Sequence, residues 1–358
     1  MQEGVDVLVA SSFGRDLFLD TWVAIAIASS LGHGGNAFLW GIEKADDHAR
    51  DRFISYPPGL AATFLSESLA PQGDKNPIDR SCLRKWIETD HAGSLEGQDR
   101  GSERMLVEFG ARRSLKLQSC RSNEGAIDEK TFETLFTDYH NDLAFWRKVE
   151  PHPSRPHDVA ALALENRLLE KIGKYFYELF DNAYKYGSVA SELEADLSQI
   201  RFMRIRKIVG SEQQLISRSK HSVPGLSDYV SNTLRSRKHK VLIELSISDF
   251  GLGILDQFLS TGPGRRFAAA PRRQTLEKLL FEKLTSNPFD PQAGNGLGNA
   301  LEAASNLGAF VSLRTGEFHY TAAFDRPGTI ERFQSIQGRG QLGRVRGTHW
   351  QFLLVSPL

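Results

Sequence analysis

The sequence is poor in cysteine, and it has neither a net charge nor a long apolar run. Only two of its 358 residues are cysteines, Cys82 and Cys120, and they lie far apart with no second pair or histidine cluster nearby. This spacing excludes a disulfide framework and a zinc site, so both are expected to be ordinary thiols. The 44 Lys and Arg residues balance 44 Asp and Glu residues. The chain as a whole is therefore not expected to attract nucleic acid or an anionic membrane.

Signals for secretion and for membrane insertion are also missing. The opening residues, MQEGVDVLVASSFGRD, contain too short an apolar run and too early an acidic residue, Asp6, for a secretion signal. No stretch approaches the roughly 18 uninterrupted apolar residues of a membrane span. We therefore expect a cytoplasmic protein with no membrane partner.

Apolar residues make up 40% of the chain, enough to bury a core in two domains of about 100–200 residues each. Residues 151–158, PHPSRPHD, contain three prolines and no helical period, so they cannot continue a helix. We place the domain boundary there. The expected domains are an N-terminal one over 1–150 and a C-terminal one over 151–358.

The N-terminal domain opens with an α/β pattern. Residues 5–12 read as a short strand, 15–31 as an apolar helix that ends at Gly32, and 36–42 as a second strand. An all-helical interpretation of this apolar run fits nearly as well. Residues 71–128 are polar and rich in Gly, Ser and Asp, which is typical of long loops. We expect a smaller α/β domain that acts as a sensor, as an effector or in partner binding.

The C-terminal half alternates helices and strands more clearly. Its periodicity predicts a long helix at 158–186 and strands at 200–209 and 239–249, with a polar basic segment between the strands. A glycine-rich loop then precedes a helix at 298–307. Three strand-like runs follow, namely AFVSLRT (309–315), EFHYTAAF (317–324) and THWQFLLV (348–355). These elements predict an α+β fold with one sheet under helices.

The first functional pattern lies on the helix at 171–187. At about 100° per residue its apolar side chains share one arc, whereas Glu178, Asn182 and Lys185 lie on the opposite side. A carboxylate, a carboxamide and an ammonium on one face can hold a metal, orient water and contact phosphate. The simpler interpretation is an ordinary amphipathic helix with a solvated charged face.

The second pattern is LIELSISDFGLGI at 242–254. Strand alternation puts Asp249 on the same face as the apolar residues before it, so a carboxylate ends a covered surface and needs a partner. The amino group of adenine is a fitting donor, and Gly251 and Gly253 let the backbone approach its flat rings closely. The alternative is a strand that simply runs into a D-x-G turn.

The third pattern is DPQAGNGLGNALEAASNLG at 290–308. Gly294, Gly296 and Gly298 are expected to form a flexible loop before a helix, whose free N–H groups and dipole attract phosphate. The loop is not a dinucleotide fingerprint, because no G-x-G-x-x-G follows a first strand.

The order of these patterns is informative. It runs from Glu-x-x-x-Asn on a helix, through Asp-x-Gly-x-Gly after a strand and Gly-x-Gly-Leu-Gly before a helix, to Gly347 and Thr348 at the start of a terminal strand. This order resembles the GHKL superfamily, the Bergerat-fold ATP-binding domains of gyrase, heat-shock chaperone ATPases, MutL and histidine kinases. The resemblance covers 151–358. It implies an α/β sandwich in which helices cover one face of a mixed sheet.

The resemblance also implies ATP and Mg²⁺ as cofactors and a role for each residue. Asn182 would ligate Mg²⁺, Asp249 would accept from the adenine amino group, and Glu178 would activate the attacking water or hydroxyl. Lys185 would touch phosphate, and Thr348 would join a water network beside Asp249. The glycine-rich segments would supply the rest of the site: Gly251 and Gly253 in the base pocket, and Gly294, Gly296, Leu297 and Gly298 in the ATP lid.

Three functions remain open. Through the resemblance, the glutamate at position 178 favours hydrolysis or serine phosphorylation. The first function is an ATPase, a conformational switch that hydrolysis resets, in a multi-protein bacterial regulatory or defence system. The second is a protein kinase that acts on serine or histidine of a separate partner. A histidine kinase also needs an accessible histidine on a helical bundle, and no long heptad hairpin surrounds His140, His152 or His157. The third is a scaffold that binds ATP without turnover.

Two basic clusters bear on partners. Residues 201–240 contain ten Lys and Arg residues against two acidic ones, a composition that suits nucleic acid or an acidic protein. We favour instead a solvated loop at 210–238 beside an edge strand guarded by charge. The second cluster, Arg265, Arg266, Arg272 and Arg273, is expected in the ATP lid, within reach of the γ-phosphate or an adjacent subunit. A protein partner and a homodimer are expected; nucleic acid is not favoured.

Overall fold

A computed structural model describes the chain over separate ranges. The described residues are 7–10, 16–31, 36–40, 57–66, 68–71, 78–79, 103–110, 179–180, 182–183, 199–220, 223–235, 241–282, 284, 295–324, 334–335 and 343–355. Several of the residues singled out above lie outside these ranges: Glu178, Lys185, Gly294, Cys82 and Cys120, together with the proline segment 151–158.

The described chain contains both strands and helices. The N-terminal elements are β1 (Val7–Ala10), α1 (Leu19–Leu31), β2 (Asn36–Trp40), α3 (Pro57–Leu65), β3 (Ser68–Pro71), β4 (Ile78–Asp79) and β5 (Glu103–Gly110). The middle elements are β6 (Gln199–Val209), α7 (Glu212–Ser219), α8 (Leu226–Arg235), β7 (Val241–Asp249), α9 (Ile254–Ser260), α10 (Gly262–Arg265) and α11 (Arg272–Phe281). The last are α12 (Asn295–Asn306), β8 (Phe310–Gly316), β9 (Phe318–Ala323), β10 (Gln334–Ser335) and β11 (Val345–Val355).

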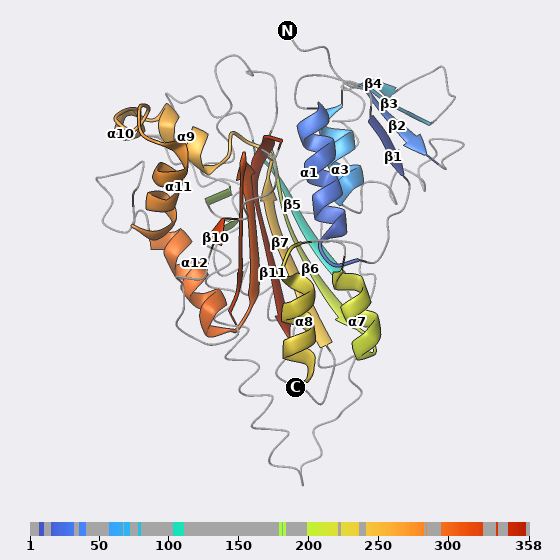
Figure 1. Cartoon of the computed structure of the whole chain (residues 1–358). Coiled ribbons are helices and arrows are strands. Elements are labelled where there is room, and N and C mark those ends of the chain that lie inside the picture. Colours follow the sequence, from blue (N-terminus) through green and yellow to red (C-terminus); the bar gives the residue numbers. More distant parts are fainter. Residues whose placement is uncertain are drawn as a thin grey trace, which may run out of the picture.

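Seven of these strands form one large sheet at the centre of the molecule (Figure 1). Its order is β10-β9-β8-β11-β7-β6-β5, and each described neighbour pair runs antiparallel. The α+β class is confirmed, whereas the expectation of a mixed sheet is wrong for this sheet. Part of the reason is the tight turn at Gly316 and Glu317, because a connection that short joins only antiparallel strands.

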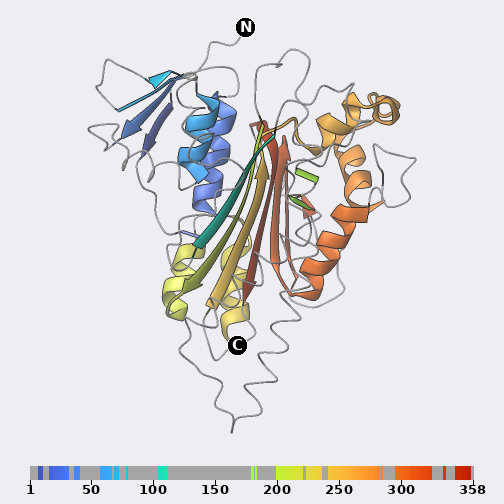
Figure 2. The ribbon, with the colours of Figure 1, turned by 180° about the vertical axis from the view of Figure 1, so that it is seen from behind.

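Helices α9, α11 and α12 cover one face of the large sheet, here called the front face (Figures 1 and 2). Side chains alternate along a strand, so β7 sends Leu245 and Ile247 to this face. There they join a core with Leu276 of α11 and Leu301 of α12. Each such buried side chain contributes about 1.5–3 kcal/mol to stability, so apolar burial holds these helices on the sheet.

The opposite, back face is covered as well. A second core contains Phe18 at the start of α1, Leu215 of α7 and Leu226 of α8, packed against Phe310 and Leu353 of the sheet. Figure 2 shows these helices on the side of the sheet away from α9–α12. The expectation that helices cover only one face is therefore wrong, because α1 comes from the N-terminal part of the chain.

The basic segment at 210–238 contains two helices. We expected a solvated loop there, but α7 buries Leu215, and α8 buries Tyr229, Val230 and Leu234 against the back face. Nor is β6 an edge strand, because β5 pairs with it from Gln199 to Arg206. This segment is part of the folded core.

The N-terminal strands form a second, smaller sheet of order β1-β2-β3-β4. The pairs β1–β2 and β2–β3 are parallel, and α1 and α3 provide the crossover connections that parallel strands require. The described elements of the opening thus alternate strand and helix, and the all-helical interpretation is wrong. Since α1 packs against β11, and β5 pairs with β6, the large sheet is built and covered by chain from both sides of the boundary expected at 151–158. Within the described ranges, no helix has both the length and the apolarity needed to cross a membrane.

Candidate functional site

Four polar side chains lie in one row at one end of the front face. The strand register aligns Arg201 of β6 with Asp249 of β7, Asp249 with Thr348 of β11, and Thr348 with Thr315 of β8. All four are buried, the most exposed being Thr348 at 8%. We call this set the polar row. It closes an otherwise apolar face, so any ligand that donates hydrogen bonds there would also meet apolar side chains.

Asp249 is the acidic member of the polar row. Its Oδ1 accepts hydrogen bonds from the backbone N–H of Gly251 at 3.0 Å and of Thr348 at 3.3 Å. Burial raises the pKa of its carboxyl to about 7, although these hydrogen bonds and the charge of Arg201 act to lower it. Near neutral pH the carboxyl is therefore close to half protonated. A donor that pairs with the ionised form would offset a desolvation cost that the protein itself compensates only in part.

Two glycines allow the turn after β7 to touch the start of β11. Gly253 has a φ of +84°, and a Cβ on it would lie 2.8 Å from Thr315 Oγ1 and 3.0 Å from the carbonyl oxygen of Gly347. Gly347 has a φ of +79°, and its Cβ would lie only 1.9 Å from the carbonyl oxygen of Asp249. Any other residue would push these segments apart. Thr315 completes the contact by accepting from the N–H of Ile254 at 3.1 Å.

Part of the first pattern lies beside the polar row. Leu179, Phe180, Asn182 and Ala183 are helical, and Asn182 is half-buried. The guanidinium of Arg201 lies 3.9 Å from the centroid of the Phe180 ring, and its Nη1 donates a hydrogen bond to the Phe180 carbonyl oxygen. Asn182 is thus only two residues from a direct contact with the strand next to Asp249. Glu178 and Lys185 of the same pattern lie outside the described residues.

The glycine-rich segment differs from its expected form. Gly296, Leu297 and Gly298 lie in the first turn of α12, which begins at Asn295 and not near residue 298 as predicted. The reason is Leu297, which packs against the front core together with Leu301, four residues later on the same helix face. A Cβ on Gly298 would meet no atom within 4 Å, so the first turn is open there. Gly294 lies outside the described ranges.

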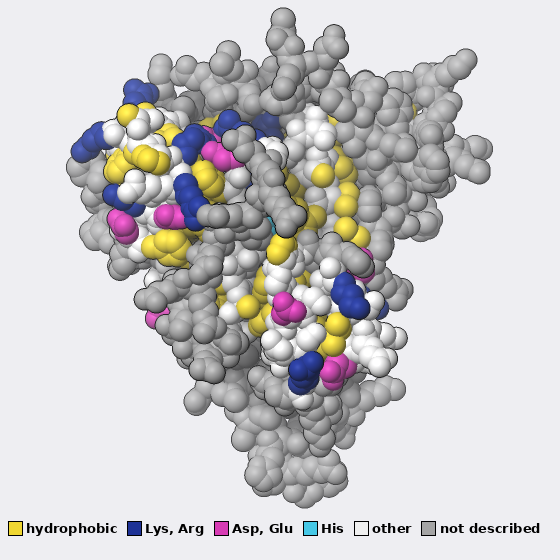
Figure 3. Space-filling view, in the orientation of Figure 1, with side chains coloured by type: hydrophobic (Ala, Val, Ile, Leu, Met, Phe, Trp, Pro, Cys, Tyr) yellow, Lys and Arg dark blue, Asp and Glu magenta, His cyan; other side chains and the backbone are white. Residues whose placement is uncertain are grey.

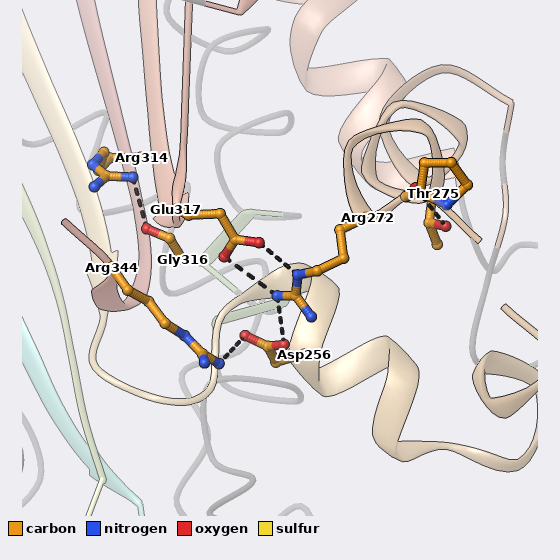
Figure 4. A network of polar contacts seen from close by, with 8 residues as sticks. Asp256, Arg272, Thr275, Arg314, Gly316, Glu317 and Arg344 are labelled. Atoms are coloured by element: carbon orange, nitrogen blue, oxygen red, sulfur yellow. Dashed lines mark hydrogen bonds and ion pairs between the residues drawn. The ribbon is translucent and has the colours of Figure 1, made fainter. Parts of the chain in front are cut away.

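The second basic cluster lies on α10 and α11 and, for Arg266, directly after α10. Arg272 at the start of α11 forms ion pairs with Glu317 in the β8–β9 turn and, at 2.8 Å, with Asp256 of α9, which also binds Arg344 (Figure 4). These pairs fasten α11 to α9 and to the sheet. Arg272, which was expected in the ATP lid, is thus held in a network of ion pairs.

The other members of that cluster are on the surface. The exposed members are Arg265, Arg266 and Arg273. Figure 3 shows basic side chains gathered with apolar ones over the part of the surface that α10 and α11 form. Arg273 pairs with Glu277 four residues along α11. Exposed pairs of this kind contribute about 0.3–0.5 kcal/mol, so they say little about function.

Arg201 and Thr315 are members of the polar row that the sequence patterns did not single out. The available signal was the one that identified Asp249, namely a polar residue that ends a run of alternating apolar ones. Arg201 precedes Met203 on β6, and Thr315 follows Leu313 on β8. What the sequence could not supply is the register that places these strand ends side by side.

The described residues contain no group of three or more His, Cys, Asp or Glu side chains that could hold a metal ion. Asn182, the predicted magnesium ligand, offers a carboxamide oxygen. Mg²⁺ is commonly held by one or two protein oxygens together with water and substrate phosphates, so a single amide oxygen is a chemically acceptable contribution.

Comparison of the chain with protein-family models, with curated proteins and with solved structures finds no match. The polar row must therefore be interpreted from its own chemistry.

Proposed function

We propose that the C-terminal part of the chain, 151–358, binds Mg·ATP at the polar row as Bergerat-fold domains do, here on an antiparallel sheet with helices on both faces. The observation that carries this proposal is Asp249, a buried carboxyl with a pKa raised to about 7 at the end of an apolar face. Adenine combines a flat apolar ring system with an exocyclic amine that donates hydrogen bonds. It would fill the apolar side of such a site and pair with the ionised carboxylate.

The phosphate end of the nucleotide would lie toward the Asn182 helix and the first turn of α12. Asn182 would contribute an oxygen to Mg²⁺, which bridges and neutralises the phosphates when bound. The open first turn at Gly298 would present free backbone N–H groups and the positive end of a helix dipole. Lys185 and Gly294, carried over from the resemblance, would add a phosphate contact and part of the lid.

The activity we propose is that of an ATPase or ATP-driven conformational switch. Glu178, four residues before Asn182 on the predicted helix, would act as general base toward the attacking water. Nucleotide binding would order the segment before α12, and phosphate release would relax it. We propose a cytoplasmic protein of a multi-protein bacterial system, with a protein partner and a homodimer as its assemblies.

The experiment that tests this proposal separates binding, hydrolysis and transfer. The full chain is incubated with Mg²⁺ and γ-labelled ATP, and free phosphate, protein-bound label and retained nucleotide are measured separately. Asp249→Asn should abolish nucleotide retention, whereas Glu178→Ala should retain nucleotide and lose phosphate release. Asp228→Asn, an exposed carboxylate on α8, is the matched control and should behave as wild type.

The remaining outcomes decide between the alternatives. Label on the protein or on an added partner would favour a kinase that acts on serine or histidine. Retained ATP with negligible phosphate release that does not depend on Glu178 would favour a scaffold. No retained nucleotide in the wild type would refute ATP binding itself.

A further inference from the structure

Arg201 connects two parts of the proposed site that are distant in sequence. Its Cα is the register partner of Asp249, and its guanidinium reaches the helix that carries Asn182. The proposed adenine end and the proposed metal end of the site therefore meet at one side chain. Because the proposed nucleotide spans both ends, their spacing would matter for its affinity.

The contact has the features of a firm tether. Arg201 is only 5% exposed and Phe180 is fully buried, so water competes little for the guanidinium. Arg201 makes a charge-assisted hydrogen bond to the Phe180 carbonyl oxygen and a cation–π contact with the Phe180 ring, at 3.9 Å. Both interactions are stronger when desolvated. Arginine is suited to this double contact, because its guanidinium is planar and stacks on a ring while its N–H groups donate in the same plane.

We propose that Arg201 is a positioning residue that fixes the Asn182 helix against the strand of Asp249, so that both ends of the site bind one nucleotide as a unit. This inference rests on the proposed function. Arg201 itself need not touch the ligand. It acts through Phe180 on the helix and through the strand register on Asp249, and it sets the distance between the two groups that would hold base and metal.

A positioning role and a purely structural role differ in what they predict for ligands of different length. A purely structural loss would weaken adenosine and Mg·ATP equally, because it would reduce the folded fraction for both. Loss of the tether would affect adenosine only through the Asp249 end, where the missing charge of Arg201 weakens both ligands alike. It would further weaken Mg·ATP, which needs both ends at a fixed spacing.

The test compares the affinities of the full chain for adenosine and for Mg·ATP by titration calorimetry. In Arg201→Met, which keeps the apolar stem, the preference for Mg·ATP over adenosine should fall by roughly 5- to 150-fold, the usual range of coupling between two sites. Arg201→Lys keeps the charge but loses the planar contact, so it should also lose most of the preference. It replaces Arg201→Met if that variant does not fold. Arg204→Met removes a buried arginine from the back face of the same strand and should leave the preference unchanged.

An unchanged preference in Arg201→Met and Arg201→Lys would overturn the inference. If the wild type binds neither ligand, the proposed function fails, and hydrogen exchange then decides the tether separately. Faster exchange over 179–183 in Arg201→Met, with 245–249 unchanged, supports a tether that positions this helix. An equal change in exchange rate over both segments overturns it.

Discussion

On the front face of the large sheet, buried polar side chains are confined to one end, whereas on the back face they occupy the middle. The front face presents apolar residues along β7 and β11 until the polar row interrupts them. The back face alternates with it and presents polar side chains on four neighbouring strands: Arg204, Arg206, Glu244, Ser246, Ser248, Ser312, Arg314, His349 and Gln351. One sheet thus carries two different kinds of buried polarity.

The polar groups of the back face bind another part of the same chain. Glu244, which is 1% exposed, accepts a hydrogen bond from the N–H of Phe18 at 3.0 Å and forms an ion pair with Arg206 at 2.8 Å. Phe18 adopts a φ of +61°, rare for a residue with a side chain, directly before α1. Thr21 donates to Ser246 at 3.0 Å, further along α1.

The comparison shows that burial of a polar group does not by itself indicate a ligand site. On the back face the middle of the sheet is polar because α1 attaches there. On the front face the helices pack on the sheet through an apolar core, and the polar row lies at the edge of that core. The following predictions test whether the two faces differ in this way.

The largest effect is expected from Glu244 on the back face. Glu244→Ala removes the carboxylate that pairs with the Arg206 guanidinium, which is 11% exposed, and with the Phe18 N–H, and removing one partner of a buried ion pair costs about 3–5 kcal/mol. Urea unfolding of the full chain measures this loss. Glu302→Ala, at an exposed position on α12, should stay within about 0.5 kcal/mol of wild type. A loss no larger than this control would mean that the back face does not hold α1 through Glu244.

The next effect concerns Asp249 on the front face and depends on pH. Below its ordinary pKa of 3.8 the carboxyl is protonated in both the folded and the unfolded chain, and between 3.8 and about 7 only the folded chain keeps the proton. Unfolding then releases a proton, so the free energy of unfolding should fall as pH rises through this window and level off above it. The total change should be a few kcal/mol.

Chemical unfolding at a series of pH values measures this slope. Asp249→Asn should lose it, whereas Asp228→Asn should keep it. If the difference in slope between wild type and Asp249→Asn has the opposite sign, Asp249 is held ionised by a partner. In that case the front face would resemble the back face, with its polar groups already paired.

A smaller effect is expected where α1 meets the middle of the back face. Thr21→Val leaves the Ser246 hydroxyl buried without its donor, which costs about 1–3 kcal/mol. Adding Ser246→Ala should recover much of that loss, because neither polar group then remains. Comparing the two single variants with the double variant in urea gives their coupling energy. A coupling energy of zero would show that this hydrogen bond does not attach the helix.

The smallest effect separates stability from binding on the front face. Gly298→Ala fills open space in the first turn of α12, so it should stabilise the fold by about 0.5–1 kcal/mol. If phosphate approaches the backbone there, the same variant should lose affinity for Mg·ATP. Thermal unfolding and nucleotide titration on one preparation measure both. Greater stability with unchanged affinity would remove this turn from the proposed site.

Much of the large sheet could be predicted from the sequence. The strands around Met203, Ile247, Leu313 and Phe352 follow from strict alternation on their apolar side, and α12 follows from its apolar stripe. Asp249 could be singled out because it ends such an alternation. These signals are local, and they are clear in the sequence because the front face is apolar almost to its end.

The cover of the back face could not be predicted. Glu244, Ser246 and Ser248 alternate with apolar residues, a pattern that normally means a solvent-facing side, and nothing local shows that α1 lies over them. Helices α7 and α8 were not predicted, because the basic composition of their segment favoured a solvated loop although residues such as Leu215 and Tyr229 are buried. The neighbours of Asp249 depend on register between strands about 50 and about 100 residues apart in the chain, which local patterns do not encode.

The close passage of Gly347 past Asp249 bears on how natural variants of this chain should be interpreted. With a Cβ placed 1.9 Å from a backbone oxygen, position 347 can accept no side chain, whether or not the protein binds a ligand. A variant that has lost all activity would still need glycine there in order to fold. Gly298 is under no such constraint, since alanine fits and adds stability. Retention of glycine at 298 would therefore indicate selection for a function, whereas retention of glycine at 347 would not.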